Sequence, residues 1–177
     1  MEDSNLKGIK GWLLIVLIGL IVSIISVAVS LNDSMPLFKP DAWHAITTYG
    51  SEAYHPLFGP WVIYEALFNV FIIIFSICLL FMMFRKSHRF PKFMIFYFIS
   101  AVFLQGIDYI LSYKVLTDLP KVSETLNVYP SLDGVMRALV QTAVWVPYFI
   151  KSKRVKATFL SESPKIILEK GPLDKDL

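Results

Sequence analysis

The sequence is poor in the residue types on which many enzymes and metal proteins rely. Among its 177 residues are one cysteine, Cys78, and three histidines. One thiol cannot close an internal disulfide, and a lone cysteine in an apolar segment packs as a small apolar side chain. His44 and His55 stand eleven residues apart, which matches no established metal motif. Since a phosphate-binding glycine loop and a serine-hydrolase elbow are also missing, the sequence predicts no catalytic group, metal or cofactor.

Charge is scarce as well. Charged residues make up 18% of the chain and hydrophobic residues 55%. The net charge of +3 is small, and the basic residues cluster at the ends of apolar segments. Because basic residues at such positions orient a membrane protein and contact headgroups, we expect no nucleic-acid partner.

Long apolar segments are abundant instead. A bilayer core of about 30 Å requires about 20 apolar residues of helix. We therefore predict an all-α membrane domain over residues 1–159, with four transmembrane helices, and a polar cytoplasmic tail over 160–177. The first segment exceeds the length of a signal-peptide core and is predicted to remain as a helix. The four apolar segments are Ile9–Leu31, Trp61–Phe84, Phe93–Leu111 and Val135–Ile150.

Basic residues indicate the orientation of these helices. The N-terminal segment, the link between the second and third apolar segments, and the C-terminal tail carry two, four and seven Lys or Arg. These thirteen compare with three in the other two loops, so we expect both termini in the cytoplasm. Those beside the membrane are expected to contact anionic lipid headgroups. They are Arg85, Lys86, Arg89, Lys92, Lys151, Lys153, Arg154 and Lys156.

The first outer loop, residues 32–60, contains one short segment of helical character. Within Asp41–Tyr49, apolar residues including Trp43 alternate with polar ones, and prolines and glycines flank the segment. We predict a short helix on the membrane surface, with Trp43 at headgroup depth. The second outer loop, residues 112–133, contains Pro120 and Pro130 and is mostly polar.

Ionisable residues inside the predicted spans are the strongest functional signal, because they are costly in a bilayer. Glu65, Asp108 and Arg137 lie on three different helices, and the helical rise places all of them in the outer half. They form one candidate site with four polar residues at helical spacing: Asn69, Gln105, Tyr109 and Gln141.

Two interpretations of this cluster remain open. In one, Arg137 lies between two carboxylates in an outward-facing pocket that relays protons or holds a small polar or cationic ligand. In the other, Arg137 pairs with Asp108 or Glu65 in a structural clasp that fixes helix register. The first suggests a small transport or sensing component. The second suggests an accessory protein that binds a membrane-protein partner or associates with itself.

Three motifs resemble a known family. They are Gly8–Leu13 (GIKGWL), Trp145–Phe149 (WVPYF) and Ser152–Phe159 (SKRVKATF). Together they resemble bacterial inner-membrane proteins catalogued as domain of unknown function 2569, over roughly residues 8–159. The resemblance implies a four-helix protein of the bacterial inner membrane and carries no activity, although Arg137 belongs to the pattern. We expect Phe159 to enter the membrane interface or to dock a cytoplasmic partner.

Overall fold

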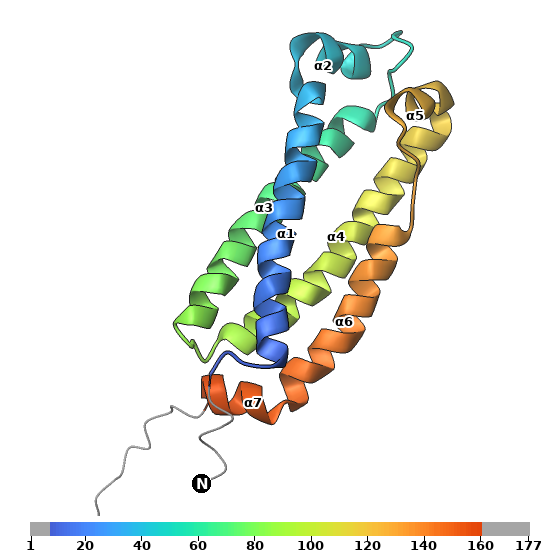
Figure 1. The fold of residues 1–177 in the computed structure, drawn as a ribbon. Coiled ribbons are helices and arrows are strands. Elements are labelled where there is room, and N and C mark those ends of the chain that lie inside the picture. Colours follow the sequence, from blue (N-terminus) through green and yellow to red (C-terminus); the bar gives the residue numbers. More distant parts are fainter. Residues whose placement is uncertain (1–7, 161–177) are drawn as a thin grey trace, which may run out of the picture.

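The computed structural model describes residues 8–160, and helices account for most of them. Four long helices run along the molecule (Figure 1). They are α1 (Trp12–Ser34), α3 (Phe58–Phe84), α4 (Phe90–Asp118) and α6 (Asp133–Lys151). The short elements are η2 (Met35–Phe38), α2 (Pro40–Thr47), α5 (Pro120–Leu126), α7 (Lys153–Val155) and the π-helical turn η3 (Lys156–Leu160).

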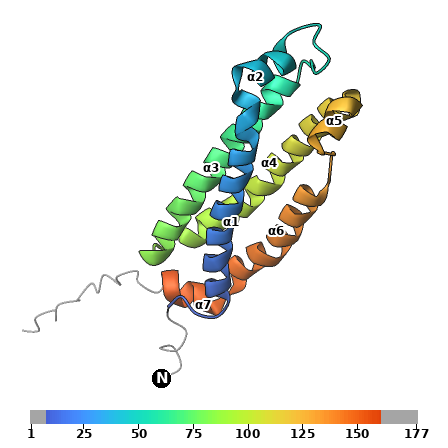
Figure 2. The same ribbon diagram turned by 45° about the horizontal axis from the view of Figure 1, so that its top comes forward.

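The long helices pack in chain order. Helix α1 packs on α3, α3 on α4, and α4 on α6, whereas α1 and α6 have little direct contact in the described part of the chain. Figures 1 and 2 show these two helices diverging from the end where α7 lies. At that end the Trp12 ring packs against Trp145 at 6.0 Å and against Tyr148 at 6.5 Å. The bundle is therefore closed at one end and open between α1 and α6 towards the other.

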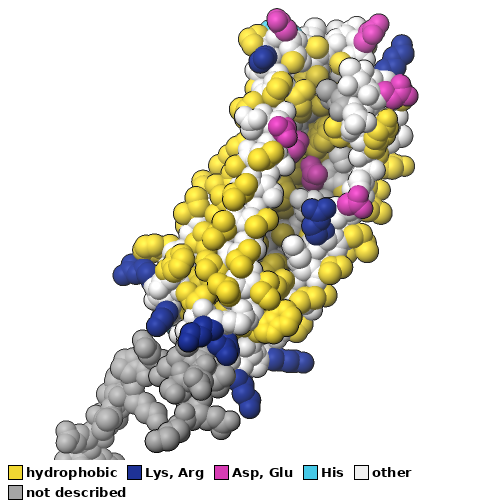
Figure 3. Space-filling model, viewed as in Figure 1, with side chains coloured by type: hydrophobic (Ala, Val, Ile, Leu, Met, Phe, Trp, Pro, Cys, Tyr) yellow, Lys and Arg dark blue, Asp and Glu magenta, His cyan; other side chains and the backbone are white. Residues whose placement is uncertain are grey.

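Three helical segments are long and apolar enough to cross a membrane: Trp12–Phe38, Phe58–Phe84 and Phe90–Asp118. Large apolar side chains cover the outer surfaces of these helices, and Figure 3 shows them over much of one face. Cys78 belongs to this outer surface of α3. The expectation that it packs in the interior is therefore wrong. Helix α6, the fourth predicted span, falls outside this apolar set.

The predicted end of the third long helix, Leu111, is too early: α4 continues to Asp118. Ser112, Val115 and Leu116 are buried at i, i+3 and i+4, so one face of the helix remains packed while the opposite face turns polar. The short helix α5 follows immediately, within the second outer loop, and Pro120 is its first residue. Pro91 lies in the first turn of α4, where its missing N–H costs no hydrogen bond.

Helix α2 confirms the predicted helix in the first outer loop. It packs on α3 and η2 rather than standing apart from the bundle. The Trp43 ring stacks on Phe38 at 5.8 Å, and Ile46 is buried. Nearby, His55 Nε2 lies 3.2 Å from Asp118 Oδ2 at the end of α4. Contacts of α2 with the rest of the protein therefore help to hold it over this end of the bundle.

The C-terminal part of the described chain closes the other end. Phe159 is 3% exposed and packs on Phe90 at 4.7 Å, so it belongs to the core and the expectation of an interfacial side chain is wrong. The N–H of Gly8 donates to Thr158 Oγ1 at 3.2 Å, which joins the two ends of the family-like motifs. In Figure 3, Lys and Arg side chains gather at this closed end, and Asp and Glu lie towards the open end. Seven of the eight predicted headgroup residues are exposed, whereas Arg154 is half-buried.

Candidate functional site: a polar cleft between α1 and α6

The space between α1 and α6 is a cavity of about 550 Å³, here called the α1–α6 cleft. Its floor is formed by α3 and α4. Four of the seven predicted site residues line it. Its polar lining consists of Ser23, Ser26 and Ser30 from α1, Asn69 from α3, Tyr97 and Gln105 from α4, and Arg137 and Gln141 from α6.

Helical periodicity explains why these side chains face the cleft. On α1, Gly19, Ser23, Ser26 and Ser30 recur at steps of four, three and four residues, which places them on one face. On α6, Gly134, Arg137 and Gln141 recur in the same way. The polar residues of two otherwise apolar helices therefore face each other across the cleft.

Asn69 is the most buried polar group in the cleft. Its side chain is 6% exposed, and its amide nitrogen finds no hydrogen-bond partner among the described residues. A buried donor without a partner costs about 1–3 kcal/mol relative to a paired one. This nitrogen is itself inaccessible, so a ligand or water in the cleft accepts from it only after the side chain turns towards the cavity.

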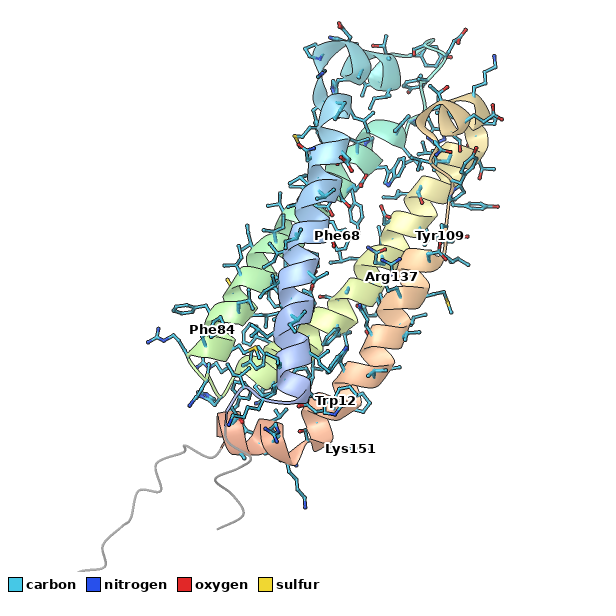
Figure 4. The ribbon with its side chains drawn as sticks, in the orientation of Figure 1. Trp12, Phe68, Phe84, Tyr109, Arg137 and Lys151 are labelled. Atoms are coloured by element: carbon cyan, nitrogen blue, oxygen red, sulfur yellow. The ribbon has the colours of Figure 1, made fainter. Side chains whose placement is uncertain are left out.

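Arg137 is the only charged residue in the cavity lining. Its side chain lies between α6 and α1, in front of α4 (Figure 4). No carboxylate of the described residues lies within 4.0 Å of its guanidinium group, so the pairing with Asp108 or Glu65 on which the clasp depends is missing. The guanidinium group is available to a ligand in the cleft.

The two carboxylates lie outside the cavity lining. Asp108 Oδ1 accepts a hydrogen bond of 3.0 Å from the indole N–H of Trp61, which links α4 to α3. Glu65 lies on α3, near enough to Asp108 for their charges to repel. The third predicted residue outside the lining, Tyr109, packs against Tyr113 at 5.9 Å. The structure therefore divides the predicted cluster into a cleft group and a carboxylate group.

The sequence reasoning missed the serines, Tyr97 and Gly134. A Cβ atom at Gly134 would overlap the amide oxygen of Gln105, so glycine is what allows Gln105 to reach this position. Tyr97 lies at the base of the cleft, and its hydroxyl lies 3.2 Å from Ser23 Oγ. The regular spacing of three serines within an apolar segment was the signal that would have identified the α1 wall.

Metal chemistry has no support in this region. Within residues 8–160, no three metal-ligating side chains lie close together. The cleft instead presents one cationic group, several amides and several hydroxyls.

Three membrane-length apolar helices and an apolar outer surface define the class of this chain as a helical membrane protein. More narrowly, it belongs to the family described as "Protein of unknown function (DUF2569)", whose sequence model matches residues 6–160. No curated protein and no solved structure matches the chain. The family match confirms the resemblance drawn from the three motifs and adds no activity.

Proposed function

We propose that this chain is a four-span protein of the bacterial inner membrane, with both termini in the cytoplasm. In this proposal the α1–α6 cleft binds a small polar ligand from the outer side. The protein then acts as a small transport or sensing component. The resemblance of its motifs to inner-membrane proteins supports this location.

The fourth span is α6, and two observations support it. Its 19 residues extend about 28 Å, close to the bilayer core of about 30 Å. Arg137 and Gln141 lower its hydropathy, but both line the cleft rather than the outer surface. Met136, Val140 and Val144, which are more than half exposed, give α6 an apolar outer face. A polar face turned towards a cavity is how membrane helices usually carry charge.

The orientation is supported by the separation of charge along the bundle. Lys and Arg gather at the closed end, and the three predicted outer basic residues are few by comparison. The positive-inside rule assigns the closed end to the cytoplasm. The cleft then opens towards the outer side.

The observation that carries the proposed function is the cavity around Asn69. A volume of about 550 Å³ falls within the range of ligand pockets, about 300–1,000 Å³. Buried polar groups in proteins are almost always hydrogen-bonded. Asn69 lines this cavity, and a turn of its side chain would bring its unpartnered amide nitrogen to an occupant, which supports a bound ligand. The separate position of the carboxylates also favours a binding site over the clasp.

Thiol labelling in intact cells tests the cleft and its orientation together. In a Cys78→Ala background, Ser26→Cys places a thiol in the cleft, whereas Ile25→Cys places one on the outer surface of the same helix turn. A membrane-impermeant maleimide reacts with the thiolate, which forms only in water. We expect rapid labelling of Ser26→Cys and little labelling of Ile25→Cys. Equal protection of both positions would refute a water-accessible outer cleft.

An accessory protein is the second candidate, and the small residues on α1 favour it. Gly19, Ser23 and Ser26 allow close approach of another helix, as at many membrane helix interfaces. In that case the cleft receives a helix from a partner protein or a second copy. Single-molecule subunit counting in lipid discs tests the second copy, because self-association gives two subunits per disc and a ligand-binding monomer gives one.

A further inference from the structure

A second cavity, of about 240 Å³, lies below the cleft between α1, α4 and α6. The two cavities share Gly19, Ser23, Tyr97 and Gln141. Because four residues border both, the two cavities are adjacent along α1 and α6, and together they are here called the groove. The groove ends where Trp145 meets Trp12 at the closed end of the bundle.

The character of this groove changes along its length. Around Arg137 and Asn69 the walls carry a charge, amides and hydroxyls. Below the four shared residues, the walls are almost entirely apolar: Ile15, Val16, Leu20, Met94, Phe98 and Trp145. Arg137 and Trp145 are eight residues apart on α6, so the apolar part begins and ends within about 12 Å of the charged group.

We propose that the groove binds an acidic phospholipid, with its phosphate at Arg137 and one acyl chain in the lower cavity. This inference rests on the proposed function, because it takes the cleft as a binding site, and it replaces the small polar ligand with an amphiphile whose polar head occupies that site. A small soluble ion would use the polar half and leave the apolar half empty. A lipid with one negative charge and a long apolar chain matches both halves, and the groove opens sideways between α1 and α6, where lipid surrounds the protein.

The charges around the groove favour an acidic headgroup. Arg137 is the one charged side chain that lines either cavity, and the described residues offer it no carboxylate within 4.0 Å. Asp108 is held by Trp61 outside the lining. A guanidinium group donates two parallel hydrogen bonds to a phosphate. A lipid phosphate at Arg137 would therefore take the place of a carboxylate partner.

Native mass spectrometry of the full-length protein in detergent tests the headgroup. The probes are phosphatidylglycerol and phosphatidylcholine with identical acyl chains, added in equal amounts. We expect a preference for phosphatidylglycerol that falls about fivefold or more in Arg137→Gln, the factor that one lost cation contributes at a membrane surface. Lys151→Gln removes an equal charge outside both cavities and is expected to keep the preference. Equal effects of the two substitutions would overturn the proposal, as would a dimer of the chain without bound lipid.

Gly19→Leu tests the acyl chain. A Cβ at Gly19 meets no atom within 4 Å, and Gly19 borders both cavities, so a leucine side chain there extends into the space where they adjoin. We expect this variant to unfold at the wild-type temperature or above, since leucine favours helix over glycine, and to lose the phosphatidylglycerol preference. Stabilisation by glycerol 3-phosphate alone, unaffected by Gly19→Leu, would overturn the lipid assignment and leave the proposed small-ligand function standing. Failure of the Ser26→Cys labelling would remove both.

Discussion

Phe159→Ala is expected to open the closed end of the bundle. The ring of Phe159 is 3% exposed and lies 4.7 Å from the ring of Phe90, at the base of the four long helices. Truncating a buried phenylalanine to alanine costs about 3–5 kcal/mol in well-packed cores. Helix α7 and η3 are short, so we expect most of this loss to appear as local opening of these two turns rather than as global unfolding.

Limited proteolysis measures this opening directly. Trypsin cleaves after Lys153, Arg154 and Lys156, which all lie in the helical turns that Phe159 anchors. Cleavage of a helix requires its local unfolding, so the rate follows the population of the open form. A loss of about 3 kcal/mol raises that population about 100-fold, because each 1.4 kcal/mol is a factor of ten. We therefore expect a comparable increase in cleavage rate.

Leu160→Ala is the matched control. Leu160 is the next residue and is 48% exposed, so its truncation removes little packing. We expect its cleavage rate to stay within about twofold of wild type, since surface substitutions usually change stability by less than about 0.5 kcal/mol. Equal cleavage of the two variants would refute the assignment of Phe159 to the core and return it to the membrane interface.

Three further substitutions probe the contacts between the long helices, each by thermal unfolding in detergent. Trp61→Phe removes the hydrogen-bond donor to Asp108 and is expected to lower the free energy of unfolding by about 1–3 kcal/mol. Asp108→Asn keeps an oxygen that can accept from Trp61 and is expected to leave stability unchanged. A larger loss in Asp108→Asn than in Trp61→Phe would contradict this hydrogen bond. Gly134→Ala displaces the Gln105 amide and is expected to lower the free energy of unfolding by about 1–3 kcal/mol. Adding Gln105→Ala removes the overlap and is expected to restore most of this loss. A double variant that is no more stable than Gly134→Ala would argue against the contact. Thr142→Val loses a 3.0 Å hydrogen bond to the carbonyl of Phe98 on α4 and is expected to lower the free energy of unfolding by only about 0.6 kcal/mol. A loss above about 2 kcal/mol would show that Thr142 does more than make this bond.

The long helices could be predicted from the sequence because a bilayer constrains both length and composition. The predicted second segment, Trp61–Phe84, ends at the same residue as α3, and the first ends within α1. The end of α4 could not be placed in this way. From Ser112 onwards only one face of that helix is buried, so the apolar run stops while the helix continues. The membrane accounts for the apolar part, and packing of one face accounts for the rest.

The candidate site could be predicted only in part. Arg137, Asn69, Gln105 and Gln141 stood out because polar groups are rare inside spans, and all four line the cleft. Their partners could not be assigned, because opposite charges at similar depth on different helices give no information on which faces meet. The indole of Trp61 takes the position at Asp108 that the clasp gave to an arginine.

The polarity of α6 and the function proposed for the cleft have the same origin. An arginine in a membrane helix costs about 2.5–3.5 kcal/mol at the helix centre on insertion scales and less near a helix end, and Gln141 adds to the low hydropathy of α6. Arg137 is the fifth residue of α6, about 6 Å from its outer end and about 21 Å from Lys151 at the closed end. A structural ion pair would offset this cost, but the described residues supply none within 4.0 Å. In the proposed complex, a phosphate at Arg137 offsets this cost, and the acyl chain fills the apolar cavity below.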